Sequence, residues 1–158
     1  MRKNTSLTPH IAAEPVTSNN WRAVAALQVK PDQQEYVNSP VFNLALCQYS
    51  PAGWSPLALR REDQIVGFLM WAVDPADQSC WLGGVMIDTA FQGLGYGKKA
   101  VAAALSMLRA QHGHHQFALS YHPENTVARR LYLGLGFQET GEVEDEEVVA
   151  RLEVTATL

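Results

Sequence analysis

Cysteine is scarce in this chain, and no stretch of it is both long and apolar enough to cross a bilayer. The two cysteines, Cys47 and Cys80, have no metal-binding spacing, so we expect reduced thiols, no metal site and a cytoplasmic location. The longest apolar run, residues 65–73, is too short to span a membrane. Residues 1–14 contain Arg2 and Lys3 but lack the apolar segment of a signal peptide. We therefore expect no membrane partner.

An excess of basic residues is missing as well. With 12 lysines and arginines against 16 aspartates and glutamates, the formal net charge is -4. This balance argues against a nucleic-acid partner and is compatible with a cationic small molecule. A hydrophobic fraction of 47% over 158 residues is enough for one core. We predict a flexible lead over residues 1–9 and a single domain over residues 10–158.

The spacing of apolar residues predicts a mixed α/β (α+β) fold with about four helices and six to seven strands. Strands are expected at residues 10–16, 57–59, 65–73, 80–87, 116–121, 137–141 and 148–154, and helices at 17–30, 32–45, 98–111 and 125–135. Pro40 should break or restart the second helix. The strands between residues 57 and 87 form an antiparallel meander, and the helix at 98–111 then makes a right-handed crossover to a parallel strand.

A glycine-rich segment, Gln92-Gly93-Leu94-Gly95-Tyr96-Gly97, lies between an expected strand and the expected helix start near Lys98. Glycines leave the backbone amides unobstructed and allow positive φ angles. A helix N-terminus adds unpaired N–H groups and a positive partial charge, so this segment suits a pyrophosphate. Lys98 and Lys99 are unfavourable at this helix end without an anion. The alternative is a glycine-rich turn that binds nothing.

The spacing of these glycines excludes two familiar phosphate loops. A nucleoside-triphosphatase loop requires Gly-Lys followed by Ser or Thr, whereas Gly97 is followed by two lysines. A dinucleotide-binding loop has the spacing G-x-G-x-x-G and follows the first strand. Here the spacing is G-x-G-x-G after what we count as the fourth strand. A different phosphate-containing ligand is therefore expected.

The pattern Gln92-x-x-Gly95-x-Gly97 resembles the Q/R-x-x-G-x-G/A motif of the GNAT family of N-acetyltransferases, and it occupies the same strand-to-helix position. A second match is Asn125, followed seven residues later by Tyr132 and then by Gly134-Leu135-Gly136-Phe137. The order of elements agrees with that family over nearly the whole chain. The resemblance implies a mostly antiparallel sheet with a splayed parallel pair of strands at its centre.

The resemblance also implies that acetyl-CoA is the cosubstrate and that its pantetheine arm lies in the splayed opening. The implied CoA-binding residues are Val85, Met86, Ile87, Gln92, Gly93, Leu94, Gly95, Tyr96, Gly97, Lys98 and Asn125. Backbone groups of residues 85–87 would bind the arm as an added strand. Amides of residues 93–98 would bind the pyrophosphate, and Asn125 would bond to the pantetheine backbone.

Tyr132 is the expected catalytic acid, because its hydroxyl would stand near the thioester sulfur in this family. The alternative is an aromatic side chain packed in the core. The identity of the general base is not decided by the resemblance, since Gly83 and Gly84 occupy a region of the fourth strand where some relatives carry an acidic residue. A water chain, the Tyr121 hydroxyl, His122 and Glu35 are the remaining candidates, and Glu35, Tyr121 and His122 are also the candidate substrate-binding residues. Histidine is a common catalytic base, although a histidine before proline, as at position 122, is also typical of a loop.

Several short segments resemble the bacterial spermine and spermidine acetyltransferase branch, so the best prediction for the acceptor is a polyamine or another small-molecule amine. Acetylation of a protein N-terminus or of an antibiotic amine is the alternative enzymatic interpretation. A CoA-binding sensor without turnover is the alternative from another class. A homodimer is expected by analogy with the family.

Overall fold

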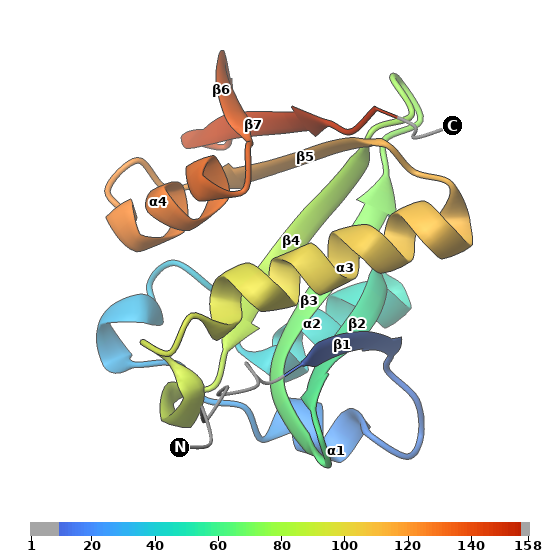
Figure 1. Ribbon diagram of the computed structural model, residues 1–158, viewed down its shortest axis with the longest axis vertical. Coiled ribbons are helices and arrows are strands. Elements are labelled where there is room, and N and C mark those ends of the chain that lie inside the picture. Colours follow the sequence, from blue (N-terminus) through green and yellow to red (C-terminus); the bar gives the residue numbers. More distant parts are fainter. Residues whose placement is uncertain (1–9, 156–158) are drawn as a thin grey trace, which may run out of the picture.

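In a computed structural model, which describes residues 10–155, one seven-stranded sheet has the order β1-β2-β3-β4-β5-β7-β6 (Figure 1). The strands are β1 (Ile11–Pro15), β2 (Ser55–Arg61), β3 (Gln64–Val73), β4 (Cys80–Ile87), β5 (Gln116–Tyr121), β6 (Gln138–Glu144) and β7 (Glu147–Glu153). Every neighbouring pair is antiparallel except β4 and β5. The predicted α/β (α+β) class, meander and crossover are confirmed. The predicted lead over residues 1–9, and residues 156–158, lie outside the described residues.

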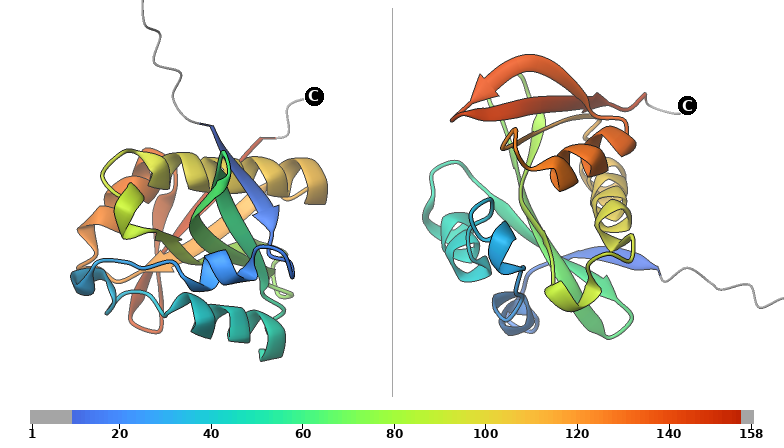
Figure 2. Two further views of the ribbon diagram at one scale, coloured as in Figure 1. Left: turned by 90° about the horizontal axis from the view of Figure 1, so that it is seen from below. Right: turned by 90° about the vertical axis from the view of Figure 1, so that its left-hand side faces the viewer.

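Four helices cover the two faces of the sheet. They are α1 (Trp21–Ala25), α2 (Pro40–Tyr49), α3 (Tyr96–His112) and α4 (Thr126–Gly134), with short 3-10 turns η1 (Pro31–Gln33) and η2 (Thr89–Phe91). Helix α3 crosses one face, and α1 and α2 lie on the other (Figure 2). One apolar cluster includes Val101 and Leu105 of α3, and a second includes Val24 of α1 with Phe68 and Met86. None of these described helices is long and apolar enough to cross a membrane.

The parallel strands β4 and β5 are paired over two positions only. Cys80 is opposite Phe117 and Trp81 is opposite Ala118, after which the strands diverge (Figure 1). On its other side β4 stays paired with β3 as far as Ile87. The main chain of β4 beyond Trp81 therefore has no strand partner on the side from which β5 has separated, and we call this region of the splay the opening. This is the predicted splayed pair.

Several predicted helix boundaries were wrong. The segment at 17–30 is helical only in α1, because Leu27 already leaves the helix and Pro31 starts η1. The predicted restart at Pro40 is confirmed, because Pro40 begins α2 with Ser39 as its N-cap, and α2 then runs to Tyr49, beyond the predicted end at residue 45. Helix α3 starts at Tyr96 rather than near Lys98, because left-handed Gly95 serves as its N-cap and Tyr96 is buried.

The final hairpin is longer than predicted. Strand β6 reaches Glu144 and β7 starts at Glu147, so Asp145 and Glu146 alone make the turn. Both have positive φ, 47° and 68°, a conformation that the favoured two-residue hairpin turn requires and that glycine and asparagine usually supply. The turn fixes where β7 begins, and so where Glu147 lies. Gly136, which follows α4, has a positive φ of 100°.

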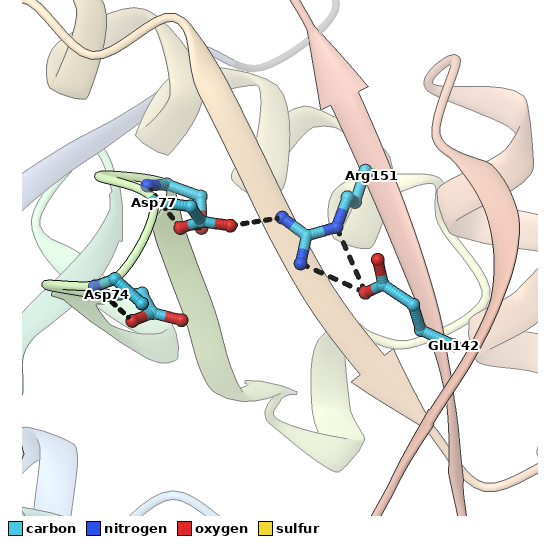
Figure 3. A network of polar contacts seen from close by, with 6 residues as sticks. Asp74, Asp77, Glu142 and Arg151 are labelled. Atoms are coloured by element: carbon cyan, nitrogen blue, oxygen red, sulfur yellow. Dashed lines mark hydrogen bonds and ion pairs between the residues drawn. The ribbon is translucent and has the colours of Figure 1, made fainter.

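A polar network connects the β3–β4 turn to the C-terminal hairpin (Figure 3). Arg151 of β7 donates to Asp77 over 3.1 Å and to Glu142 over 3.0 Å. Asp77 also accepts the backbone N–H and the hydroxyl of Ser79. The hydrogen bond from the Ser79 hydroxyl is the main cause that lowers the pKa of Asp77, and Arg151 adds to it. The charged form of Asp77 is therefore favoured in the folded protein.

Asp77→Asn is expected to lower the melting temperature at neutral pH and to have little effect in acid. A lowered pKa in the folded state contributes stability above the unfolded pKa, and this contribution disappears as pH falls through the folded pKa. The ordinary value is 3.8 and the folded value is lower, so the difference between variant and parent should shrink below 3.8 and vanish only below the folded pKa. Thermal melts from neutral pH to pH about 2 measure this. An equal difference at every pH would contradict it.

Candidate functional site

The glycine-rich loop presents open backbone at the start of α3. Gly93, Leu94 and Gly95 are exposed, and a Cβ atom added to Gly93 or Gly95 would meet nothing within 4 Å. Gly95 has φ 79° and caps α3, so the unpaired N–H groups of Tyr96, Gly97 and Lys98 belong to the first turn. The ring of Tyr96 is buried and lies 6.1 Å from that of Phe91, which anchors the helix start. We call residues 93–98 the cradle, because their backbone N–H groups can bind an anion.

Gln92 ties this loop to the end of β4. Its side-chain Nε2 donates to the carbonyl oxygen of Ile87 over 2.8 Å and to Oε1 of Gln33 over 2.7 Å. The amide therefore fixes the entry of the loop against both β4 and η1. Lys98 is exposed at the helix start, and the ammonium of Lys99 lies 5.9 Å from the centre of the Tyr96 ring.

Val85, Met86 and Ile87 form the part of β4 that lies beside the opening. Met86 pairs with Phe68 and Ile87 with Gly67 on the β3 side, while β5 has already diverged. A register shift between β3 and β4 accompanies Gly84, whose φ is 59°. The free side of residues 85–87 is therefore available to an extended ligand that continues from the cradle.

Helix α4 is packed directly against the start of α3. A Cβ atom on Gly97 would come within 2.7 Å of Cδ1 of Leu131, so a larger residue here would push that side chain aside. Asn125 caps α4, its Oδ1 accepting the N–H of Ala128 over 3.2 Å. The structure thus brings both motif residues of the second match, Asn125 and Tyr132, to the helix beside the loop.

Tyr132 points into the sheet rather than into solvent. It is 8% exposed, stacks on Tyr121 with ring centres 5.8 Å apart and meets Phe137 edge-on at 6.0 Å. Burial raises its pKa, and the negative charge of Glu147 raises it further. The phenol therefore stays protonated at neutral pH. Tyr132 is part of the core, as the alternative interpretation predicted, and its role as the acid stays a prediction.

Two of the base candidates already have partners. The Tyr121 hydroxyl donates to Oε1 of Glu139 over 2.7 Å, and burial with this bond raises its pKa to about 12, which makes it a poor base at neutral pH. The Nδ1 atom of His122 accepts the N–H of Glu124 over 3.2 Å. Its ring lies 5.5 Å from that of Tyr36 in the loop before α2.

Glu35 lies beside this contact and is exposed. After burial, the charge of Glu35 is the next cause that raises the pKa of Tyr36. The structure thus brings Glu35, Tyr36 and His122 to one region at the end of β5, although Glu35 and His122 are far apart in sequence.

The space near Gly84 is filled from α2. A Cβ atom on Gly84 would lie 2.9 Å from Nδ2 of Asn43, a residue that is 1% exposed. A carboxylate on β4 at this position would therefore collide with α2. Neither polar atom of the Asn43 side chain has a hydrogen-bond partner within residues 10–155.

Glu147 is a candidate that the sequence analysis missed. It is half-buried at the start of β7, and its Oε1 accepts the hydroxyl of Ser120 over 3.3 Å. Burial raises the pKa of this carboxyl group. In the sequence it is one of four consecutive acidic residues, 144–147, which is typical of a solvated turn. Only the pairing of β7 with β5 reveals its neighbours.

Comparisons with known proteins agree with this geometry. Residues 21–137 match the family model described as the acetyltransferase (GNAT) family. The chain is similar to a spermine/spermidine N(1)-acetyltransferase of Bacillus subtilis, with 32% identity over 82% of this chain and 88% of that protein.

Solved structures agree in fold. A spermidine N-acetyltransferase from Vibrio cholerae in complex with CoA and spermine superposes with a TM-score of 0.70 at 17% identity, covering 92% of this chain and 95% of that one. An acetyltransferase from Salmonella typhimurium that modifies the N-terminal serine of ribosomal protein L7/L12 gives 0.72 at 13% identity, covering 92% and 96%. Two different kinds of acceptor are thus found on one architecture.

Proposed function

The chain belongs to the acetyltransferase (GNAT) family and is an acetyl-CoA-dependent N-acetyltransferase, and we propose that it acetylates a polyamine such as spermidine or spermine. The observation that carries this acceptor is the 32% identity with the Bacillus subtilis spermine/spermidine enzyme over 82% of the chain. The structural likeness to the Vibrio cholerae enzyme supports the fold alone.

In this proposal acetyl-CoA is bound along the β4 side of the opening. The residues present fit it, because the cradle at Gly93 and Gly95 is open and the main chain of residues 85–87 faces the splay. First-turn amides of α3 bind the pyrophosphate, Gln92 holds the loop in place, and Asn125 contacts the pantetheine arm from α4. The thioester then lies where β4 and β5 have separated, close to Tyr132.

Tyr132 donates a proton to the departing thiolate. The phenol carries its proton throughout the neutral range, as a proton donor must. Transfer is direct from thioester to amine. Burial raises the pKa of Cys80 to about 12 and that of Cys47 to about 11, so neither thiol is a competent nucleophile for an acyl-enzyme.

The acceptor enters on the side of the opening that carries the contact between Tyr36 and His122. Negative groups surround this contact, since the charges of Glu35, Glu124 and Asp32 all act on the Tyr36 hydroxyl. Carboxylates at the entrance raise the local concentration of a polycation and leave neutral amines unaffected. This charge pattern supports a polyamine over a peptide N-terminus.

A thiol-release assay with acetyl-CoA and a panel of diamines, polyamines, aminoglycosides and N-terminal peptides tests the proposal. We expect amine-dependent CoA release that is fastest with spermidine or spermine and weakens as salt is added, because exposed charges are screened. Preference for a peptide would replace the proposed acceptor. Tight CoA binding without release across the whole panel would favour a sensor.

Gly95→Val should weaken CoA binding by about tenfold or more, because lost hydrogen bonds to a charged group are each worth about 1.5–3 kcal/mol. Valine strains a left-handed position and its side chain enters the space in front of the cradle. Gly113→Val is the matched control, since Gly113 has φ 71° at the other end of α3 and open space around it. Calorimetry should detect weaker CoA binding in Gly95→Val alone. Equal losses would contradict the assignment of the cradle.

A further inference from the structure

The two faces of the sheet bring different groups to the end of β5. Phe117, Leu119 and Tyr121 belong to the apolar cluster under α3 and α4. Because side chains alternate along a strand, Ser120 projects from the opposite face. Ser120 is opposite Val149 and Tyr121 is opposite Val148, so Glu147 lies on the same face as Ser120. The hydrogen bond between Ser120 and Glu147 agrees with this.

Tyr132 and Glu147 thus lie on opposite faces of the sheet near the end of β5. Tyr132 stacks on Tyr121 on the face covered by α3 and α4. Glu147 accepts a hydrogen bond from Ser120 on the other face. The two are close enough for the charge of Glu147 to act on the Tyr132 hydroxyl. An acyl transfer needs two such groups, because the attacking nitrogen loses a proton while the departing sulfur gains one. Both atoms are bonded to the same carbonyl carbon during the transfer.

Within residues 10–155 the other candidate carboxylate for the first of these tasks, Glu35, is exposed. Strand β4 carries Gly83 and Gly84, and Asn43 fills the space at Gly84. The Tyr121 hydroxyl is committed to Glu139, and His122 accepts a backbone N–H. Glu139 itself is paired with Arg129 over 2.7 Å. Glu147 is half-buried, accepts a hydrogen bond from the Ser120 hydroxyl, and is close enough to Tyr132 for its charge to act on the phenol.

Resting on the proposed function, we infer that Glu147 is the catalytic base: its carboxylate binds the acceptor ammonium and takes its proton. The freed nitrogen lone pair forms the N–C bond to the thioester carbon, and the C–S bond breaks. The departing sulfur takes the proton of the Tyr132 hydroxyl, and Tyr132 regains a proton from the acylated nitrogen. Glu147 then releases its proton to water, so the sum is amide, thiol and one proton.

The protonation of Glu147 is set by groups on every element around it. Burial is the main cause that raises the pKa of Glu147, and Asp145 in the turn and Glu144, its cross-strand partner on β6, raise it further. The Ser120 hydroxyl on β5 and the charge of His122 lower it. On α4, Tyr132 is neutral at working pH. The activity should therefore fall on the acidic side as this carboxyl group is protonated.

Glu147→Gln tests the inference. We expect kcat/KM with spermidine to fall by about a hundredfold or more and its acidic limb to flatten, because general-base catalysis contributes about 10²–10⁴. CoA affinity by calorimetry should be unchanged. Glu144→Gln, an exposed neighbour of the same charge, is the control and should stay within a few-fold of the parent. Glu147→Asp should recover part of the rate while retaining the acidic limb.

Ser120→Ala gives a readout that a structural role would not move. The Ser120 hydroxyl lowers the pKa of Glu147, so its removal should shift the acidic limb to higher pH while leaving the plateau rate largely intact. An active parent enzyme whose Glu147→Gln variant keeps kcat/KM and the acidic limb overturns this inference alone. A parent enzyme that releases CoA with no amine overturns the proposed function and this inference with it.

Discussion

Tyr132→Phe is expected to reduce kcat for acetyl transfer by about a hundredfold or more, the usual contribution of a positioned general acid. Phenylalanine keeps the ring that stacks on Tyr121 and meets Phe137, so the fold and the apolar packing should be retained. The proton donor beside the departing thiolate is lost. Thiol-release kinetics measure the rate, and calorimetry should find CoA binding unchanged.

The matched control for this prediction is Tyr121→Phe. Tyr121 belongs to the same stack, but its hydroxyl donates to Glu139 on the outer side. Its removal should cost a hydrogen bond worth about 1 kcal/mol and leave most of the activity. A Tyr132→Phe enzyme that retains the full rate at every pH would show that Tyr132 is an aromatic core residue and not the acid.

Gly67→Ala is expected to have the largest effect on the scaffold. A Cβ atom at Gly67 would lie 2.6 Å from the carbonyl oxygen of Met86 and 2.9 Å from Cδ1 of Ile87. A backbone oxygen cannot rotate away, so β3 and β4 must separate where they are paired. Overpacking of this kind costs about 1–3 kcal/mol. The same displacement moves residues 85–87, so melting temperature and CoA affinity should fall together.

Gly134→Ala is the control for this substitution. Gly134 is the last residue of α4, and the nearest atom to an added Cβ is the ammonium of Lys98 at 4.0 Å. Alanine in place of glycine favours a helix by up to about 1 kcal/mol, so this variant should melt at the same or a higher temperature. A Gly67→Ala protein as stable as its parent would contradict this prediction, because it would mean that β3 and β4 can separate to accommodate a methyl group without loss of stability.

Strands β3 and β4 could be predicted from the sequence because they are largely continuous apolar runs. Residues 65–73 and 80–87 were predicted nearly to their ends, since buried strands leave little freedom in where apolar residues occur. The bounds of α1 and α2 were harder to predict. The segment from residue 17 to 45 has prolines at 31 and 40, and packing against β3, rather than its own periodicity, decides which parts become helical.

The candidate site divides in the same way. Gln92, the three glycines, Asn125 and Tyr132 form short motifs that sequence can reveal, because each depends on local spacing. Glu147 could not be found in this manner. Its importance comes from Ser120, which is brought beside it by the pairing of β5 with β7, and from a two-residue turn made without glycine. Both are tertiary features that a run of four acidic residues conceals.

The two-residue contact between β4 and β5 means that the molecule consists of two half-sheets, β1 to β4 and β5 to β7, with few main-chain rungs between them. A cosubstrate that bridges the gap would supply the missing rungs. Such a ligand stabilises the folded state in proportion to the logarithm of its concentration. The cellular level of acetyl-CoA would then determine how firmly the halves are joined as well as how fast the enzyme works.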